Sequence, residues 1–280
     1  SRDGSADMVE AKFPQARLIR NPRNVGFSAG NNVALRLVTG RHVLLLNTDT
    51  VVRRDTLRRM VEFMDAHPEA GAAGCRILNP DGSLQLDSRR GLPTPLASFS
   101  KMIGLSRLFP HSRRLAHYNM TYLDPSQTSE VEVLSGSCLM VRRQAMEQVG
   151  LLDEDYFMYG EDIDWCFRIR SAGWRIFYVP TTEIIHFRGE SGRGEPLRVL
   201  YHKSRAMSTF VSKHMRDRYR FMPLWLLQLA ILLHAVLKFA VGVGRRLAAP
   251  AVDAALILLG VRLALAIRYL VFMFQGQGAG

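Results

Sequence analysis

Short apolar segments of strand length alternate with helical patterns through the first two hundred residues, and this alternation is the strongest constraint on the fold. Residues 41–46 form an apolar run of strand length, which is typical of a buried parallel strand. In the next segment, four apolar residues between positions 57 and 64 recur at helical spacing, so a helix beginning at Asp55 should bury one face. Residues 72–78 form a second strand-like run. This pattern predicts an α/β sheet.

The remaining segments up to residue 187 fit the same pattern. Residues 88–128 are the exception, because they are basic and rich in Pro and Ser, and they predict a long surface loop or a partly ordered insert. The other expected elements are a helix at 7–13, a strand at 16–19, a helix capped by Ser28, strands at 131–141, 174–179 and 183–187, and helices at 143–149 and 161–172.

The C-terminal part changes character. Residues 223–243 are apolar over about the length of one bilayer-spanning helix, and 252–274 form a second apolar stretch. If the first stretch crossed a membrane, Arg245 and Arg246 would lie opposite the basic run at 198–220, against the positive-inside tendency. Interfacial or re-entrant helices therefore compete with a two-span hairpin. Two helices of a soluble bundle are the remaining alternative.

The net charge of +12 and pI of about 10.2 indicate an anionic partner. The basic run at 198–220 directly precedes the first apolar stretch, which favours a membrane surface. No recognised nucleic-acid-binding module is present, so we do not expect a nucleic-acid partner. The three cysteines are far apart and form no Cys-x-x-Cys pair, which argues against a zinc site or a disulfide framework.

Three carboxylates lie within four positions in the segment 157–165, Phe-Met-Tyr-Gly-Glu-Asp-Ile-Asp-Trp. If the aromatic residues around them pack nearby, Glu161, Asp162 and Asp164 lie against apolar walls. Such surroundings raise the proton affinity of a carboxylate and suit a general base. The alternative is the acidic first turn of an ordinary helix, where carboxylates interact with the helix dipole. These residues alone leave both interpretations open.

Polar residues also follow two of the expected strands. Asn47 and Asp49 come directly after residues 41–46, at the edge of a sheet where ligands bind, and their oxygens suit Mg²⁺ or Mn²⁺. A simple strand-end turn is the alternative. His186 follows another strand as a possible further ligand or as a packed structural side chain.

The glycine-containing loop 24–32 leads into a helix. Its backbone N–H groups are placed to bind an anion or a nucleotide, although its spacing matches neither a P-loop nor a dinucleotide fingerprint. Alternatively, Gly26 only supplies a turn with positive φ.

Taken in order, five motifs resemble those of family 2 glycosyltransferases with the GT-A fold. They lie at 24–32, 44–50, 134–143, 157–165 and 186–191, and the resemblance covers about residues 1–200. The subgroup that the chain most resembles is the rhamnosyltransferase-like proteins of bacterial cell-wall and O-antigen assembly. Five motifs in the right order are specific for the family and much less specific for the sugar.

The resemblance implies a Rossmann-like nucleotide-diphospho-sugar transferase domain over residues 1–200, with a mixed sheet flanked by helices. A basic juxtamembrane segment at 201–222, two apolar membrane-associated helices at 223–274 and a tail at 275–280 would follow. The family's first strand, the helix after it and the second strand would precede the residues present here.

The resemblance also implies a role for each motif. Asp49 and His186 would bind Mg²⁺ or Mn²⁺ that bridges the donor diphosphate, with Asn47 as a weaker ligand. Asp162 would be the general base of a single inverting displacement, and Glu161 would support it. The implied donor-binding residues are Asn24, Gly26, Asn31, Asn47, Asp49 and Arg188, and the implied acceptor-binding residues are Gly136, Ser137, Tyr159 and Trp165, with core packing as an equal alternative for Trp165.

The expected reaction moves a sugar, best matched by rhamnose from dTDP-rhamnose, to a hydroxyl of a glycan or polyprenyl-linked acceptor. Its expected location is the cytoplasmic face of the bacterial plasma membrane. A sugar-phosphate nucleotidyltransferase is an alternative, but it needs a basic glycine-rich activation loop that this chain does not show. A non-catalytic membrane-associated protein of the same fold is disfavoured by the presence of Asp162 and His186.

Overall fold

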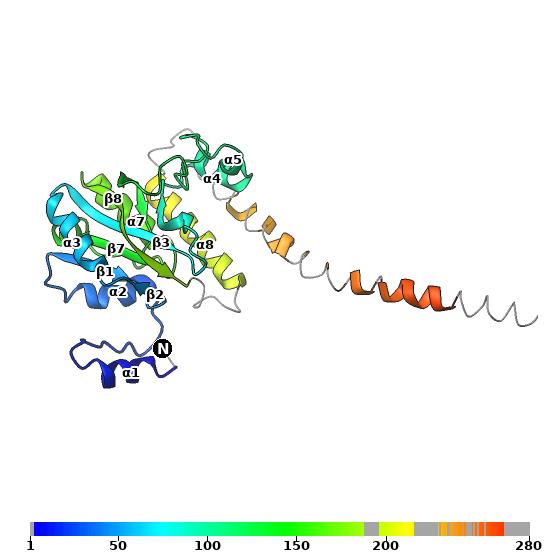
Figure 1. The fold of residues 1–280 in the computed structure, drawn as a ribbon, viewed down its shortest axis with the longest axis horizontal. Helices are drawn as coiled ribbons and strands as arrows, with labels where there is room; N and C mark the ends of the chain where they lie inside the picture. The colour runs from blue at the N-terminus through cyan, green and yellow to red at the C-terminus, as the bar shows by residue number, and fades with distance from the viewer. Residues whose placement is uncertain are drawn as a thin grey trace, which may run out of the picture. The chain divides into compact units, whose positions relative to one another are not determined.

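The computed structural model describes residues 3–187 and 196–215 and parts of 229–265. The chain divides into two compact units, Ser1–Ile231 and Leu232–Gly280, and the first holds the sheet (Figure 1). Among the described residues, the strands of this sheet are β1 (His42–Leu46), β2 (Thr50–Val52), β3 (Ala70–Leu78), β5 (Ser129–Glu130), β7 (Cys138–Arg142) and β8 (Arg175–His186).

The strand order is β1-β7-β3-β8-β2, and β5 also pairs with β8. Only β3 and β8 are parallel among these described strands, and the other pairs are antiparallel. The predicted α/β sheet is therefore confirmed as a mixed sheet. The prediction that residues 41–46 form a parallel strand was wrong, because β1 pairs with β7 in antiparallel register from His42↔Arg142 to Leu46↔Cys138.

Helices cover both faces of the sheet. Successive side chains of a strand point to opposite faces, so Ala72 and Ala73 of β3 belong to different core clusters. The cluster around Ala73 includes Met60, and the cluster around Ala72 includes Trp165 and Ile169. The helices that supply these residues are α3 (Thr56–Ala66) on one face and α7 (Glu161–Ser171), with α6 (Arg143–Val149) beside it, on the other.

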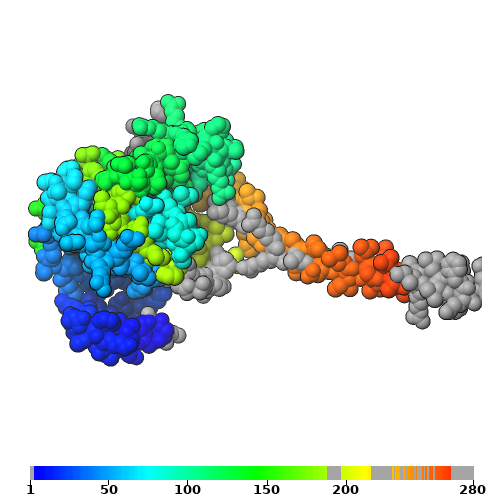
Figure 2. Space-filling model, viewed as in Figure 1, coloured from blue at the N-terminus to red at the C-terminus, as the bar shows by residue number. Residues whose placement is uncertain are grey.

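The segment 88–128 is more ordered than the sequence predicts. It contains β4 (Arg89–Arg90), α4 (Pro95–Met102) and α5 (Leu105–Leu108), and β4 pairs with β6 (Val133–Leu134). Glu132 ties the segment to the sheet unit, because its carboxylate accepts hydrogen bonds from the Leu92 backbone N–H at 2.6 Å and the His117 ring at 2.9 Å. Residues 95–120, coloured teal to green, lie together at the upper right of the sheet unit as viewed in Figure 2.

Several predicted boundaries need correction. The described residues 16–19 form no strand. Ser28 does not cap α2 (Phe27–Leu35), which begins after Gly26; its hydroxyl donates to the Tyr156 carbonyl at 2.7 Å instead. The two strands predicted at 174–179 and 183–187 are one irregular strand, β8. The helix predicted at 7–13 is α1 (Ser5–Lys12).

The basic segment begins as a helix. α8 (Pro196–Phe210) continues into a π-helical turn, Val211–Met215. The apolar stretches predicted at 223–243 and 252–274 lie partly outside the described residues. In the part of the chain that the structure describes, no helix combines the length and apolar character needed to cross a membrane.

Candidate active site

Three of the predicted metal-binding residues meet where strands end. β1 ends before Asn47, β2 begins just after Asp49, and β8 ends at His186, which is paired with Thr50 of β2. The Asp49 Oδ1 and His186 Nε2 atoms are 3.2 Å apart, and the Asn47 amide nitrogen is 3.4 Å from the same ring nitrogen. The backbone fixes this corner, because the Thr50 hydroxyl donates to the Asn47 carbonyl at 2.7 Å.

Gln85 orients the ring of His186 and was not predicted from the sequence. Its amide nitrogen donates to the His186 carbonyl at 2.8 Å, so its oxygen faces the His186 Nδ1 at 3.1 Å. An amide oxygen only accepts, so Nδ1 carries a proton, and Nε2 is the ring nitrogen that faces Asp49. Such a partner fixes the tautomer of metal-binding histidines. Gln85 precedes the ring by about a hundred residues, and no local motif marks it.

These donors fit a hard divalent cation. Two neighbouring ligands of an octahedral Mg²⁺ or Mn²⁺, each about 2.1 Å from the ion, lie about 3.0 Å apart, and the Asp49–His186 separation is 3.2 Å. Within the described residues, no three His, Cys, Asp or Glu side chains are arranged to hold a metal ion, so other coordination positions would fall to the Asn47 side chain, water or substrate oxygens. Arg188, predicted to contact the donor, lies outside the described residues.

The carboxylates Glu161 and Asp162 open α7 after a sharp turn. Tyr159 and Gly160 both have left-handed backbone conformations, with φ of 70° and 87°. Glycine adopts this conformation freely, whereas a bulky residue such as Tyr159 is strained there. The helix-start interpretation is therefore correct as a location, and it is compatible with the catalytic interpretation.

Arg90 faces the Asp162 carboxylate. Its guanidinium donates to Oδ2, the same oxygen that accepts the Gly136 backbone N–H at 3.3 Å. Burial alone would lower the pKa of Arg90, but the charge of Asp162 raises it overall, so the arginine is a permanent cation. Arg90 reaches this position because β4 pairs with β6 through Arg90↔Val133, a pairing that no local sequence pattern announces.

Glu161 differs from its neighbour. The residue is 7% exposed, and its Oε2 atom has no hydrogen-bond partner among the described residues. Burial, and then the charge of Asp162, raise the pKa of the Glu161 carboxyl to about 8. Glu161 therefore carries its proton at neutral pH, which limits repulsion between the two adjacent groups.

The loop 135–137 connects the two clusters. The Ser137 carbonyl accepts the Asn47 backbone N–H at 3.0 Å, while the Gly136 N–H donates to Asp162. The position of a Cβ on Gly136 would be 3.6 Å from the Asp162 Cβ. The strand-end cluster and the α7 carboxylates thus flank one loop and belong to one site.

The loop that contains Asn24 and Gly26 packs against the approach to α7. The Phe27 N–H donates to the Phe157 carbonyl at 2.7 Å, and a Cβ on Gly26 would lie 2.5 Å from that oxygen. With φ of 89°, Gly26 is required for both the turn and the close approach. The Asn24 side chain accepts the Gly26 N–H, and the Asn31 side chain donates to the Phe27 carbonyl. Donor binding by these residues stays a prediction.

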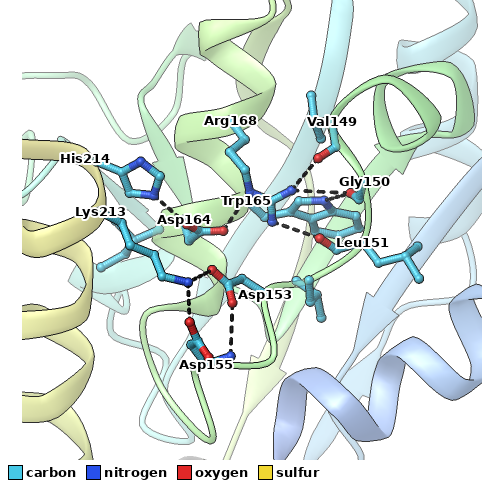
Figure 3. Close-up of polar contacts among 12 residues, drawn as sticks. Val149, Gly150, Leu151, Asp153, Asp155, Asp164, Trp165, Arg168, Lys213 and His214 are labelled. Carbon is cyan, nitrogen blue, oxygen red and sulfur yellow. Dashed lines mark hydrogen bonds and ion pairs between the residues drawn. The ribbon is translucent and has the colours of Figure 1, made fainter.

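The two predicted aromatic acceptor contacts have different surroundings. Trp165 is completely buried, and its ring N–H donates to the Gly150 carbonyl at 2.9 Å (Figure 3). It therefore has the core-packing role, and its ring does not face an acceptor. Tyr159 is only partly buried, and the Lys203 ammonium lies 4.9 Å from the centre of its ring.

Comparison with known proteins places this site in context. The family model described as glycosyltransferase-like family 2 matches residues 1–208. N-acetylglucosaminyl-diphospho-decaprenol L-rhamnosyltransferase of Mycobacterium tuberculosis is 32% identical over 217 residues, which cover 73% of this chain and 70% of that protein. Rhamnosyltransferase WbbL of Escherichia coli is 29% identical over 177 residues, which cover 60% of this chain and 63% of that protein.

A solved structure with a similar fold is the mannosyltransferase PcManGT from Pyrobaculum calidifontis in complex with GDP-Man and Mn²⁺. The match covers 92% of this chain and 69% of PcManGT, with a TM-score of 0.51. At 19% sequence identity, this likeness shows a shared fold alone.

Proposed function

The chain belongs to family 2 of the glycosyltransferases, and from this premise we propose that it is an inverting, metal-dependent rhamnosyltransferase. It is a transferase with a GT-A-like mixed α/β fold. The proposed reaction moves rhamnose from dTDP-rhamnose to a hydroxyl of a glycan or polyprenyl-diphosphate-linked sugar. The observation that carries the proposal is that Asp162 and the Asp49–His186 pair flank the same loop, 135–137.

The strand-end cluster is the proposed donor side. Asp49 and His186, with Asn47, would hold Mg²⁺ or Mn²⁺, whose charge would offset the charge that develops on the departing diphosphate. The Mn²⁺ in the PcManGT complex supports this assignment, although it does not identify the metal. The names of two relatives, both rhamnosyltransferases, support rhamnose as the transferred sugar.

The α7 side is the proposed base. Asp162 would take the proton from the acceptor hydroxyl as that oxygen attacks the anomeric carbon from the face opposite the diphosphate, which inverts the configuration. Arg90 and the Gly136 N–H fix one carboxylate oxygen, so the base is oriented before the acceptor arrives. The protonated Glu161 beside it adds no second negative charge.

The acceptor is proposed from the name of one relative and from the charge of this chain. One relative is named for N-acetylglucosaminyl-diphospho-decaprenol, an anionic lipid-linked sugar. The net charge of +12 suits such an acceptor and an anionic membrane surface. The proposed location is therefore the cytoplasmic face of the plasma membrane.

A donor screen tests this function. The full chain is incubated with dTDP-rhamnose, UDP-sugars or GDP-mannose, with a short prenyl-diphospho-GlcNAc acceptor, in Mn²⁺, Mg²⁺ or EDTA, and release of nucleoside diphosphate is measured. We expect acceptor-dependent release of dTDP from dTDP-rhamnose that EDTA abolishes. Faster release from GDP-mannose would reject the donor assignment, and full activity in EDTA would reject the metal.

A further inference from the structure

A groove of about 550 Å³ lies between α8 and the segment that leads into α7. Phe157 lines one side, and Tyr201, His202 and Arg205 of α8 line the other. The Phe157 and His202 rings are stacked, with their centres 5.2 Å apart. These three α8 side chains have no part in the site described above, and the volume suits a small ligand.

The C-terminal end of α8 is fixed to the body of the domain. In the π-helical turn, the His214 ring lies 2.6 Å from an Asp164 oxygen, and Lys213 pairs with Asp153 and Asp155 (Figure 3). Phe210, at the end of α8, is fully buried. This anchoring holds the rest of α8, and thus one wall of the groove, in place.

The groove adjoins the proposed base. A Cβ on Gly160 would lie 3.0 Å from the Ala206 Cβ of α8, so the helix touches the turn directly before Glu161 and Asp162. The Phe157 carbonyl also accepts a hydrogen bond from the Phe27 N–H. The Phe27 ring lies next to Gly136, as does the Asp162 Cβ. The groove therefore leads to the α7 side of the site.

The acidic residues of the groove wall are engaged by other side chains. Asp155 pairs with Lys213, and the Glu154 carboxylate accepts from Asn32 at 2.9 Å and Arg36 at 3.1 Å. Lys213 is shared with Asp153, so these contacts offset part of the two negative charges from outside the groove. Arg205 of α8 adds a positive charge to the groove wall that a ligand would meet.

Arg205 is joined by His202 on the same side of α8. Arg205 is exposed, and its residue spacing from His202 and Arg198 is three and seven, which places all of them on one helix face. Arginine binds phosphate oxygens in a bidentate manner, and the aromatic rings beside it suit a sugar or prenyl group.

We propose that this groove is the subsite for the diphosphate of the acceptor, with Arg205 and His202 binding its oxygens. The inference rests on the proposed function, and it adds where the acceptor is held. The donor diphosphate belongs at the Asp49–His186 pair, on the other side of loop 135–137 from Asp162. In an inverting displacement the acceptor approaches from the side of the base, and the groove lies on that side.

Kinetics with two acceptors test the subsite. The variants are Arg205→Gln and His202→Gln, and Arg58→Gln on α3 is the control, because it removes the same charge from a side chain that is 71% exposed. One acceptor is short-chain prenyl-diphospho-GlcNAc, and the other is a neutral alkyl glycoside of GlcNAc. We expect Arg205→Gln to raise KM for the diphosphate acceptor about tenfold or more. The KM values for dTDP-rhamnose and for the neutral glycoside should stay unchanged, and so should every value for Arg58→Gln. An unchanged KM for the diphosphate acceptor, or an equal rise for both acceptors, overturns the proposal.

Direct binding separates failure of the subsite from failure of the proposed function. Calorimetry with geranyl diphosphate should show binding that Arg205→Gln weakens about tenfold or more and Arg58→Gln leaves unchanged. If this pattern appears without any glycosyl transfer, the anion subsite stands and the proposed function falls. If transfer occurs but Arg205→Gln binds geranyl diphosphate normally, the function stands and the subsite falls. If Arg205→Gln loses only its binding to phosphatidylglycerol vesicles, the groove is a headgroup site and the proposal is wrong.

Discussion

Two carboxylates on α7 lie two positions apart and both bind an arginine, yet they belong to different parts of the molecule. Asp164 accepts from Arg168 at 2.7 Å and lies 2.6 Å from the His214 ring (Figure 3). Asp162 accepts from Arg90 and from the Gly136 backbone. Two residues correspond to roughly 200° around an α-helix. Asp164 therefore faces the π-helical turn, and Asp162 faces the loop 135–137 between the two halves of the site.

The difference lies in how completely each group is enclosed. The Asp164 side chain is 1% exposed, and both its oxygens are paired, one with Arg168 of the same helix and one with the His214 ring, which joins the π-helical turn to α7. The Asp162 side chain is 14% exposed and lies next to the buried, protonated Glu161. An enclosed and fully paired carboxylate stabilises the fold, whereas one that is oriented but still reachable can exchange a proton with a substrate.

The largest effect should come from Asp162→Asn. An amide keeps the shape of the side chain but cannot accept the acceptor proton, so kcat should fall by about 10³–10⁴-fold. Donor binding, measured as the Kd for dTDP-rhamnose with Mn²⁺, should stay the same. Turnover near that of the unsubstituted chain would remove Asp162 as the base and break the contrast with Asp164.

The same substitution at the neighbouring carboxylate should affect stability instead. Asp164→Asn leaves the Arg168 and His214 side chains facing a neutral amide in a buried position. We expect the free energy of unfolding to fall by about 3 kcal/mol, the lower part of the range for a broken buried ion pair. Urea unfolding measures this loss, and kcat per folded molecule should change little. A large fall in kcat with unchanged stability would mean that the roles of the two residues are reversed.

The raised pKa of Glu161 makes the free energy of unfolding depend on pH. Its pKa is raised from 4.5 to about 8, so the native state holds a proton that the unfolded state releases between these values. This contribution to stability is fully present below the unfolded pKa and is lost as pH rises through the native one. The unsubstituted chain should lose about 3–4 kcal/mol more than Glu161→Gln between about pH 5 and pH 8.

Urea unfolding at several pH values measures this difference. Glu62→Gln is the control, because Glu62 is 66% exposed and should give a curve parallel to that of the unsubstituted chain. Parallel curves for Glu161→Gln as well would show that Glu161 is ionised when buried. Glu161 and Asp162 would then both be negatively charged, contrary to the prediction that Asp162 alone carries a charge.

Local sequence predicted the positions that local geometry controls. Asn47, Asp49 and His186 lie at the ends of strands, and strand ends meet at one edge of a sheet, so their proximity could be expected. Arg90 could not, because its place depends on the β4–β6 pairing, which joins residues distant in the sequence. Gln85 could not, because its partner His186 lies about a hundred residues further along the chain. Trp165 was ambiguous because a helix start does not reveal which face is covered, and the packing of α7 on the sheet decided it.

The smallest effect should come from Lys213, the other anchor of the π-helical turn. Its side chain is 34% exposed and pairs with Asp153, which is 24% exposed, and with Asp155, which is 68% exposed, so water screens part of the attraction. Lys213→Met keeps the aliphatic stem and should cost less than about 1 kcal/mol, with a difference that shrinks as NaCl is raised. A cost equal to that of Asp164→Asn, insensitive to salt, would show that the exposed pair holds α8. The buried Asp164–His214 contact would then have no special part in joining α7 to α8.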